Sequence, residues 1–119
     1  MKLTSIAPML PVAKLAASVA FYKELGFTVG NRADELGWAM LRFGSCQLML
    51  DQSIAQGGRA ARNSVIYLYP DDVAAYHARL RKAGIAVPDL AVTFYGMTEF
   101  RLTDPDGNQL WIGQPTAAH

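Results

Sequence analysis

The side chains that most often perform catalytic or metal chemistry are scarce in this sequence. Cys46 is the only cysteine, so the chain has no internal disulfide and no CxxC metal motif. Its apolar neighbours predict a small buried residue rather than a reactive nucleophile. The only histidines are His77 and His119. We interpret His77 as a partly buried residue of a predicted helix and His119 as part of a frayed terminus, so neither predicts a metal ligand.

Aromatic side chains are the other residues with recognisable chemistry. The chain has no G-x-S-x-G elbow and no P-loop. Phenylalanine, tryptophan and tyrosine make up 10% of the residues, and several of them fall in stretches that read as strands. Aromatic walls bind flat rings by stacking and bind cations over their faces. The chemistry that the residue types favour is therefore recognition of a small molecule, with packing of a core or an interface as the plainer alternative.

Length and composition limit the protein that must position these residues. The 119 residues fit one compact domain, or two very small units that need each other. The content of 51% hydrophobic and 18% charged residues excludes a disordered chain, and a net charge of +1 lacks the basic excess of a nucleic-acid binder. No run of roughly 18 apolar residues predicts a membrane span. Without a signal-peptide pattern either, we expect a cytosolic protein.

The chain contains an internal repeat. Residues 15–29 align with residues 73–87, and residues 47–50 (QLML) resemble residues 109–112 (QLWI). The identical pairs in the longer alignment are Ala16 and Ala74, Ala17 and Ala75, Ala20 and Ala78, Gly26 and Gly84, and Val29 and Val87. The repeat predicts two modules that are built alike.

Each half has the same order of predicted elements, β-α-β-β-β. The first half has strands at 6–12, 27–31, 38–43 and 46–51, with a helix whose apolar face holds Leu15, Val19 and Tyr22. The second half has strands at 65–69, 85–87 with a weak extension, 99–103 and 109–112, with a helix whose apolar face holds Val73, Tyr76 and Leu80. One half of about 60 residues would be marginal alone, so we expect the two to share a core.

Local signals set the limits of these elements. Gly26 and Gly84 are suited to the left-handed conformation that ends a helix. Asp71 and Asp72 favour the start of the second helix. The turns of the last hairpins are predicted at residues 104–107 (DPDG) and 44–45 (GS), and residues 56–63 read as the loop between the halves.

These motifs resemble the vicinal oxygen chelate superfamily, which includes glyoxalase I, extradiol dioxygenases, fosfomycin-resistance enzymes and bleomycin-resistance proteins. The resemblance rests on residues 12–22 followed by Leu25-Gly26-Phe27, on residues 71–73 with Leu80 and residues 83–85, and on residues 104–108 (DPDGN). It covers nearly the whole chain. It implies an α+β fold in which two βαβββ modules form a curved mixed sheet with the helices on the convex side. The domain is expected to span residues 1–119, with one module at about 4–52 and the other at about 64–114.

Two further stretches are similar to the bleomycin-resistance branch of that superfamily. They are residues 95–100, just before the DPDG turn, and Gly37-Trp38 at the start of a strand. The branch implies a homodimer whose modules pair across subunits, with two ligand grooves at the interface.

The metal site of the superfamily's enzymes is not predicted here. Their ligands lie in the first and last strands of each module, at positions that fall on Ala7, Met49, Val65 and Trp111 in this sequence. A metal needs side chains that donate lone pairs, typically from nitrogen or oxygen. Asp51 lies near Met49 on the same strand face, but no histidine lies near Ala7 or Val65. We therefore expect no metal and no other cofactor.

Strand alternation, applied to the concave face that the resemblance implies, predicts a ligand-binding lining. Arg42 and Arg101 are expected towards its rim. The predicted lining is Trp38, Met40, Met49, Asp51, Tyr67, Tyr69, Glu99 and Trp111, with Phe94 and Tyr95 on a nearby loop.

The resulting hypothesis is a metal-free protein that sequesters an aromatic or cationic natural product, as in bleomycin-type resistance, in a groove at the interface of a homodimer. The near-neutral charge and the arginines at 42, 59, 62 and 101 also admit a neutral or anionic ligand. Two alternatives remain open: a glyoxalase- or dioxygenase-like enzyme with a non-standard site, for example Asp51 and Glu99 with water, and a structural or regulatory dimer. We expect no nucleic-acid or membrane partner.

Overall fold

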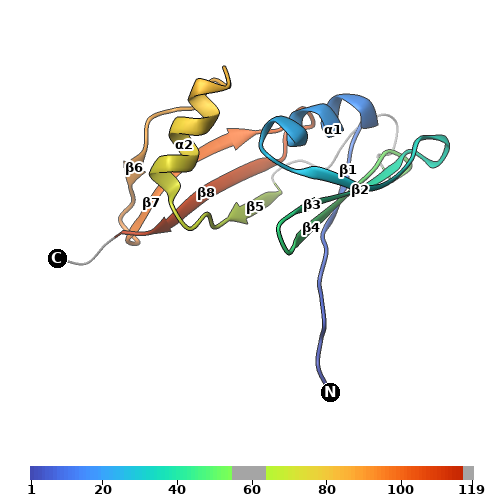
Figure 1. The fold of residues 1–119 in the computed structure, drawn as a ribbon, viewed down its shortest axis with the longest axis horizontal. Helices are drawn as coiled ribbons and strands as arrows, with labels where there is room; N and C mark the ends of the chain where they lie inside the picture. Colours follow the sequence, from blue (N-terminus) through green and yellow to red (C-terminus); the bar gives the residue numbers. More distant parts are fainter. Residues whose placement is uncertain (55–63, 117–119) are drawn as a thin grey trace. The chain divides into compact units, whose positions relative to one another are not determined.

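The computed structural model describes residues 1–54 and 64–116, and the chain divides into two compact units. Unit 1 is Met1–Arg62 with Pro105–Gly107, and unit 2 is Asn63–Asp104 with Asn108–His119. Each unit contains one helix that lies across one sheet (Figure 1). The expected loop at 56–63, with Arg59 and Arg62, and the terminal His119 lie outside the described residues.

Unit 1 is a four-stranded mixed sheet with one long helix. Its elements are β1 (Met9–Pro11), α1 (Leu15–Glu24), β2 (Thr28–Ala33), a 3-10 turn η1 (Asp34–Leu36), β3 (Trp38–Phe43) and β4 (Cys46–Asp51). The strand order is β1-β4-β3-β2. Strand β1 runs parallel to β4, and the other neighbours are antiparallel.

Unit 2 repeats this connectivity. Its elements are β5 (Val65–Leu68), α2 (Val73–Lys82), β6 (Ala91–Val92), β7 (Met97–Thr103) and β8 (Gln109–Pro115). The strand order is β5-β8-β7-β6, with β5 parallel to β8 and the remaining pairs antiparallel. The two βαβββ modules that the repeat predicts are therefore confirmed.

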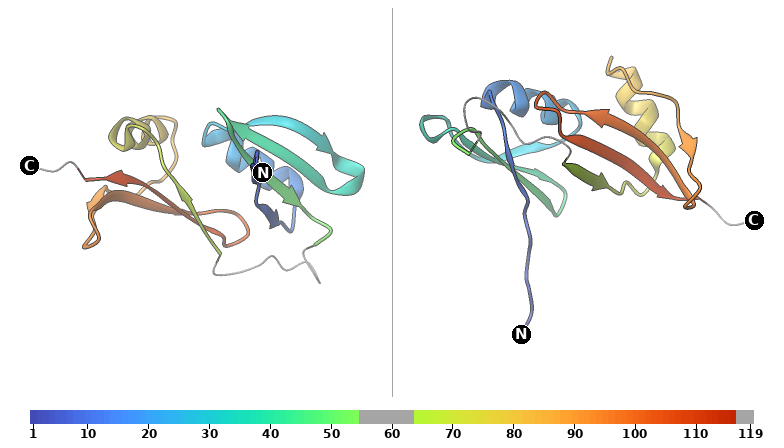
Figure 2. Two further views of the ribbon diagram at one scale, coloured as in Figure 1. Left: turned by 90° about the horizontal axis from the view of Figure 1, so that it is seen from below. Right: turned by 180° about the vertical axis from the view of Figure 1, so that it is seen from behind.

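The core of each unit lies between the helix and one face of the sheet. In unit 1, Leu15, Val19 and Tyr22 of α1 are buried, as their spacing predicted. The strand residues that alternate towards the helix are buried as well: Ala39, Leu41, Leu48 and Leu50 in unit 1, and Phe100, Leu102, Leu110 and Ile112 in unit 2. The further views in Figure 2 show each helix on one side of its own sheet. Within the described residues, neither helix combines the length and apolar character needed to cross a membrane.

Both helices end in the same way. The amide of Phe27 donates to the carbonyl of Tyr22, and the amide of Gly26 donates to that of Lys23. Ile85 and Gly84 make the equivalent bonds to Leu80 and Arg81 at the end of α2. This pair of bonds needs a left-handed residue, and Gly26 and Gly84 have φ of 113° and 89°. The predicted helix ends are confirmed.

His77 takes the partly buried position predicted for it. It is 8% exposed. Its Nε2 lies 2.7 Å from the carbonyl oxygen of Pro88, and its ring meets Phe100 edge-on at 5.0 Å. It therefore packs α2 against the following segment and against β7.

The strand predicted at 85–87 is wrong, because the carbonyl groups of this stretch bond to α2. Arg81 Nη2 donates to the carbonyl of Val87 at 2.9 Å, and His77 contacts the carbonyl of Pro88. Proline also lacks an amide hydrogen for a strand ladder. Pairing with β7 begins only at β6, Ala91–Val92.

Two predictions about the first module also need correction. The first strand begins at Met9 rather than at residue 6, and Ile6 is 82% exposed. Cys46 is exposed, not buried. Its side chain has the same alternation as Leu48 and Leu50, but it stands opposite Phe43 at the turn end of the hairpin, and Phe43 is exposed as well.

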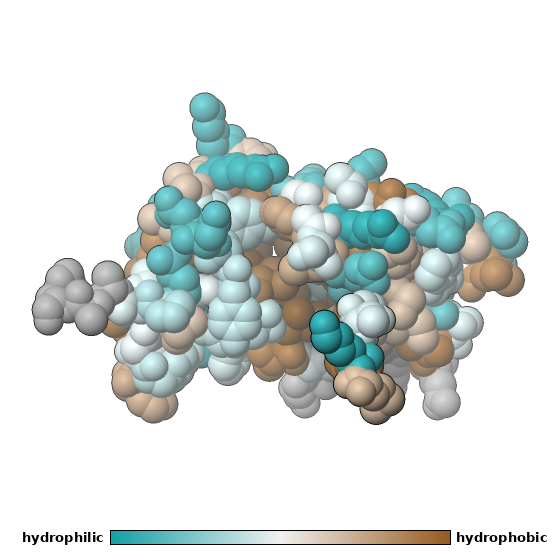
Figure 3. Space-filling view, turned by 60° about the horizontal axis from the view of Figure 1, so that its bottom comes forward, coloured by the Kyte–Doolittle hydropathy of each residue, from teal (hydrophilic) through white to brown (hydrophobic). Residues whose placement is uncertain are grey.

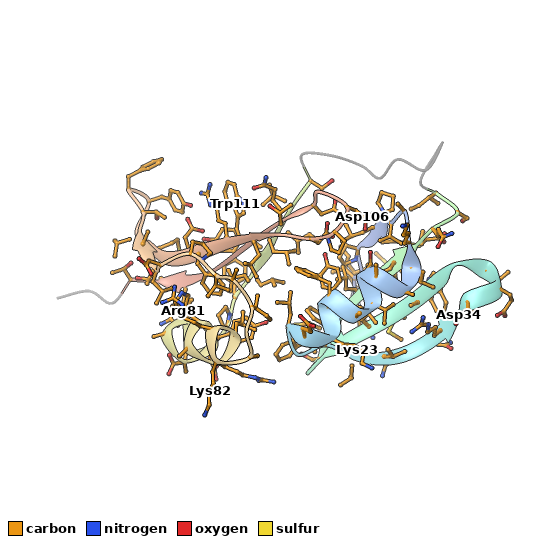
Figure 4. All side chains as sticks on the ribbon, turned by 90° about the horizontal axis from the view of Figure 1, so that it is seen from above. Lys23, Asp34, Arg81, Lys82, Asp106 and Trp111 are labelled. Carbon is orange, nitrogen blue, oxygen red and sulfur yellow. The ribbon has the colours of Figure 1, made fainter. Side chains whose placement is uncertain are left out.

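The tip of the turn between β7 and β8, Pro105–Gly107, belongs to unit 1. Asp106 Oδ1 accepts from the amide of Ala13 at 2.7 Å, and Oδ2 accepts from the buried hydroxyl of Ser18 at 2.8 Å. Figure 4 shows Asp106 beside the first turn of α1. Asp104 and Asn108 close the turn below it, where the amide and side-chain nitrogen of Asn108 donate to the Asp104 carboxylate at 2.9 and 3.0 Å. The predicted DPDG turn is confirmed, and it also stabilises the start of a helix.

Candidate functional site

The face of the unit 2 sheet opposite α2 brings together a row of three side chains from neighbouring strands. We call this face open face 2; its strand residues are Val65, Tyr67, Glu99, Arg101, Thr103, Gln109, Trp111 and Gly113. Tyr67 of β5 stands opposite Trp111 of β8, which in turn stands opposite Arg101 of β7. Figure 4 shows Trp111 on the side of the sheet away from Arg81 and Lys82 of α2.

Ring contacts define this row. The guanidinium of Arg101 lies 3.6 Å from the centroid of the Trp111 ring, a cation–π contact. Tyr67 meets Trp111 nearly edge-on at 6.2 Å and stacks on Tyr69 at 4.7 Å with an interplanar angle of 15°. Tyr69 remains 70% exposed. Arg101, which was expected towards the rim, extends to the neighbouring strand and covers one face of the indole.

Glu99 is a buried carboxylate held by two phenols. It is 3% exposed. The hydroxyl of Tyr67 donates to Oε2 at 2.9 Å, and that of Tyr95 donates to Oε1. Arg101 Nη2 lies 3.6 Å from the same Oε1 and 3.2 Å from the Tyr95 hydroxyl. A buried charge needs such partners, because its desolvation is otherwise very costly.

The electrostatics follow this network. Partial burial, reinforced by the hydrogen bond to Glu99, raises the pKa of Tyr67 well above its usual range. The hydrogen bond with Tyr95, together with the Glu99 carboxylate, raises the pKa of Arg101. At neutral pH the face therefore presents a neutral phenol, a permanent cation and a carboxylate whose two oxygens are engaged.

Gly113 provides the space that Glu99 occupies. The two residues stand opposite each other on β8 and β7. A Cβ at position 113 would lie 2.7 Å from Cβ of Glu99 and 2.9 Å from the carbonyl oxygen of Thr98. Only glycine leaves the carboxylate in this position without a shift of backbone atoms.

The corresponding face of unit 1 has a different row. We call it open face 1; its residues are Met9, Trp38, Met40, Arg42, Gln47, Met49 and Asp51. Met9, Met49 and Met40 stand opposite one another across β1, β4 and β3. Arg42 Nε donates to the sulfur of Met40 at 3.5 Å. Asp51, which stands opposite Trp38, accepts from the amide and hydroxyl of Ser53 at 2.7 and 2.5 Å.

The predicted lining is thus divided between the two open faces. Trp38, Met40, Met49 and Asp51 lie on open face 1, and Tyr67, Glu99 and Trp111 lie on open face 2. Tyr69 stacks on Tyr67, and Tyr95 contacts Glu99. Phe94 is fully exposed in the turn before β7 and touches Tyr95 edge-on at 5.0 Å.

Met9 also belongs to open face 1, although it is absent from the predicted lining. It stands opposite Met49 and is 42% exposed. Its alternation with Ala7 was the signal that could have identified it, because residues two apart on a strand share a face.

A divalent metal does not fit these residues. Ala7, Met49, Val65 and Trp111, the positions that the resemblance assigns to the superfamily's ligands, have side chains that offer no nitrogen or oxygen lone pair. In the part of the chain that the structure describes, no three His, Cys, Asp or Glu side chains group closely enough to hold an ion. We therefore derive no chemistry through a metal.

Comparisons with known proteins agree with the fold. The family model of the glyoxalase/bleomycin resistance protein/dioxygenase superfamily matches residues 3–112, so the chain belongs to this superfamily. A comparison with curated proteins finds no match.

Solved structures similar to this chain include a bleomycin-binding protein and a bleomycin resistance determinant. A bleomycin-binding protein, solved in complex with bleomycin, has 27% identity and a TM-score of 0.80, over 94% of this chain and 98% of that one. A bleomycin resistance determinant encoded on transposon Tn5 has 25% identity and a TM-score of 0.78, over 97% and 100%. A lactoylglutathione lyase from Agrobacterium tumefaciens, with 21% identity, a TM-score of 0.72 and 95% of both chains covered, shares the fold.

Proposed function

We propose that the protein binds a small planar aromatic compound on open face 2 and sequesters it. The observation that supports this proposal most directly is the row of Tyr67, Trp111 and Arg101 on the sheet face opposite α2. Exposed rings bind flat ligands by stacking and by exclusion of water. Tyr69, stacked on Tyr67 and still largely exposed, extends the surface that a ring can cover.

Binding without turnover is favoured by the state of the carboxylates. Both oxygens of Glu99 accept tyrosine hydroxyls, and Asp51 accepts two hydrogen bonds from Ser53. A general base needs a carboxylate oxygen that can reach the proton it removes. These bonds occupy both oxygens of Glu99 and Oδ1 of Asp51, so the enzyme alternative built on Asp51, Glu99 and water has fewer acceptor sites than two free carboxylates would offer. Turnover of a bound compound, followed by chromatography, would favour the enzyme.

Bleomycin is the first compound to test, because it is named in two of the similar solved structures, at 27% and 25% identity. A resistance role would follow from tight binding, since a sequestered drug cannot reach its target. Quinoxaline-like and mitomycin-like compounds complete the panel, because they present flat rings of other shapes and charges.

The decisive experiment uses the chain's two tryptophans as separate reporters. In the Trp38→Phe variant, Trp111 is the only emitter, and in Trp111→Phe only Trp38 emits. A ligand on open face 2 should quench or shift the emission of the Trp38→Phe variant, and its affinity should fall about 10-fold or more in Trp111→Ala, as expected for loss of a stacking partner. If no compound changes the emission of either variant, the result favours the alternative of a structural or regulatory dimer.

A homodimer is the second part of the proposal. The resemblance to the bleomycin-resistance branch implies it, and exposed apolar side chains are available for it. They include Val65, Tyr69, Val92 and Phe94 in unit 2, and Figure 3 shows hydrophobic surface among hydrophilic stretches on one side of the molecule. Sedimentation equilibrium should give twice the 13.0 kDa chain mass. A monomeric mass at micromolar concentration would contradict the proposed dimer, and with it a ligand groove at the dimer interface.

A further inference from the structure

The two charged side chains of open face 2 differ in what they offer a ligand. Glu99 is 3% exposed, and each of its oxygens accepts a tyrosine hydroxyl. The Arg101 side chain is 48% exposed. Strand alternation places no other ionisable Asp, Glu, Lys, Arg or His on this face of β5, β7 and β8. Among the described residues of these three strands, a ligand that contacts the face therefore meets one accessible charge, and it is positive.

Arg101 also has hydrogen-bonding capacity to spare. Its Nη2 donates to the hydroxyl of Tyr95 and lies 3.6 Å from Oε1 of Glu99. Within the described residues, Nε and Nη1 have no hydrogen-bond partner. A guanidinium presents its donors in a rigid planar fork that matches the two oxygens of a carboxylate, sulfonate or phosphate. The contact with Trp111 and the bond to Tyr95 hold this fork in place before a ligand arrives, which reduces the entropy that binding would cost.

The same contact disfavours a cationic ligand. The face of the Trp111 ring attracts positive charge, and the Arg101 guanidinium already lies 3.6 Å from its centroid. A cationic ring would have to displace Arg101 or lie beside it, against like-charge repulsion. A neutral or anionic ring meets no such repulsion, and only an anion gains a charge-assisted hydrogen bond to the guanidinium.

Open face 1 has no charged side chain at the equivalent place, since its arginine, Arg42, lies two residues further along β3, opposite Gln47. Where unit 2 pairs Arg101 with Trp111, unit 1 pairs Met40 with Met49, and neither methionine carries charge. The two rows occupy equivalent places in the repeat, so the arginine is not a requirement of the fold.

We infer that open face 2 selects planar aromatic anions, with the acidic group paired in plane with the free donors of Arg101 and the ring against the neighbouring aromatic side chains of the face. This inference rests on the proposed binding function and names the chemical class of its ligand. It predicts a preference opposite to the one that a cationic drug such as bleomycin would need.

Three naphthalene probes of equal size test the charge preference: 2-naphthoate, neutral 2-naphthamide and 2-naphthylmethylammonium. Calorimetric titration of the unaltered protein at low ionic strength should rank the anion first, about 10-fold or more tighter than the cation, as expected for one charge-assisted hydrogen-bonded pair. Arg101→Gln should remove that advantage while changing the affinity for 2-naphthamide by less than about threefold. Arg101→Lys, which keeps the charge and loses the fork, should fall between the two.

Lys82→Gln is the matched control. It also removes one positive charge, but from α2 on the opposite side of the same sheet (Figure 4). It should leave the ranking and the affinities unchanged. An equal loss of 2-naphthoate affinity in Lys82→Gln and Arg101→Gln would mean that net charge, and not the Arg101 site, attracts the anion, and would overturn the inference.

The remaining outcomes separate the inference from the function on which it rests. If 2-naphthylmethylammonium binds as tightly as 2-naphthoate, or more tightly, the anion preference is wrong and the binding function stands. If the three probes fail while a compound of the fluorescence panel binds, the inference is likewise overturned. If neither the probes nor the panel binds, the proposed function itself fails.

Discussion

At the scale of single residues, Glu99 explains why the aromatic side chains of open face 2 are not equivalent. Tyr67 and Tyr95 donate to its carboxylate, so their hydroxyls stabilise a buried charge. Trp111 and Tyr69 do not bond to Glu99; Tyr69 is 70% exposed, and the guanidinium of Arg101 covers one face of the Trp111 ring. Removing Trp111 should therefore affect binding more than folding, whereas removing the Tyr67 hydroxyl should affect folding first, since a buried acceptor would lose its donor.

Gly113→Ala should destabilise the fold by about 1–3 kcal/mol, the usual cost of forcing a methyl group into a filled site. The new Cβ would meet Cβ of Glu99 at 2.7 Å and backbone oxygen of Thr98 at 2.9 Å, and neither is the flexible end of a side chain. The midpoint of urea denaturation measures the change.

Gly30→Ala is the control for this substitution. It lies in a strand of unit 1, and its added Cβ would meet only the ends of the Met40 and Arg42 side chains, at 3.0–3.1 Å. Those ends can move, so the loss should be smaller than for Gly113→Ala. Equal losses would show that strand glycines, and not the space beside Glu99, decide the effect.

Tyr76 makes folding stability depend on alkaline pH. Burial raises its pKa from 10.0 to about 12. Because the folded state holds this proton more tightly than the unfolded state, the contribution is complete below pH 10 and is lost as the pH rises towards 12. Between pH 8 and pH 11 the free energy of unfolding should fall by about 1 kcal/mol on account of Tyr76. Urea titrations should show a smaller fall in Tyr76→Phe, and an identical fall would contradict the assignment.

At the scale of elements, both helices begin with the same contact. The amide of Leu15 donates to Gln52 Oε1 at 3.1 Å, and that of Val73 donates to Gln114 Oε1 at 2.5 Å. Gln52 and Gln114 are equivalent in the repeat, five residues after the matching Gln47 and Gln109. Each module thus uses the end of its last strand to satisfy the first amide of its own helix, which otherwise has no partner.

Only α1 receives additional support from the DPDG turn. Asp106→Ala would leave the amide of Ala13 and the buried hydroxyl of Ser18 without their acceptor. The expected loss of stability is about 1–3 kcal/mol. Hydrogen exchange should quicken in the first turn of α1 but not in α2, whose start is capped by its own Asp72.

Asp89→Ala is the control for that experiment. Asp89 is an exposed carboxylate that pairs with Arg81 at 3.1 Å, and exposed pairs contribute little. Its removal should leave the denaturation midpoint almost unchanged. Faster exchange in both helices of Asp106→Ala would indicate general destabilisation instead of the loss of a local acceptor.

Elements with a strong hydrophobic pattern could be predicted closely, and contacts between side chains could not. β3 and β4 have the predicted bounds because apolar residues alternate along them. The stretch at 85–87 has strand-like residues, yet the carbonyl of Val87 accepts from Arg81 and that of Pro88 contacts His77. No local sequence pattern reveals these contacts. Alternation likewise placed Trp111 and Glu99 on one face. It could not predict that two tyrosines bury Glu99, or that Arg101 covers the indole, because those depend on rotamers and on the neighbouring strands.

At the scale of the whole molecule, the two units have one framework and two surfaces. Strand order, helix ends and helix starts agree between them. The open faces differ, with three methionines in one row and tyrosine, tryptophan and arginine in the other. Methionines adapt to irregular partners, whereas the aromatic and guanidinium groups favour flat ones. A superfamily framework therefore supports different chemistry through the residues of these faces alone.

The residue types at the four positions that the resemblance assigns to metal ligands predict how the whole protein responds to a chelator. Because Ala7, Met49, Val65 and Trp111 offer no nitrogen or oxygen lone pair, neither folding nor binding should depend on a divalent ion. After dialysis against EDTA, the midpoint of thermal unfolding and the affinity for the best-binding aromatic compound should equal those of untreated protein. Addition of Zn²⁺, Ni²⁺ or Mn²⁺ should restore nothing, since nothing was lost. A fall in affinity that one of these ions reverses, with one equivalent found by elemental analysis, would require ligands other than these four positions and would return the enzyme alternative to the front.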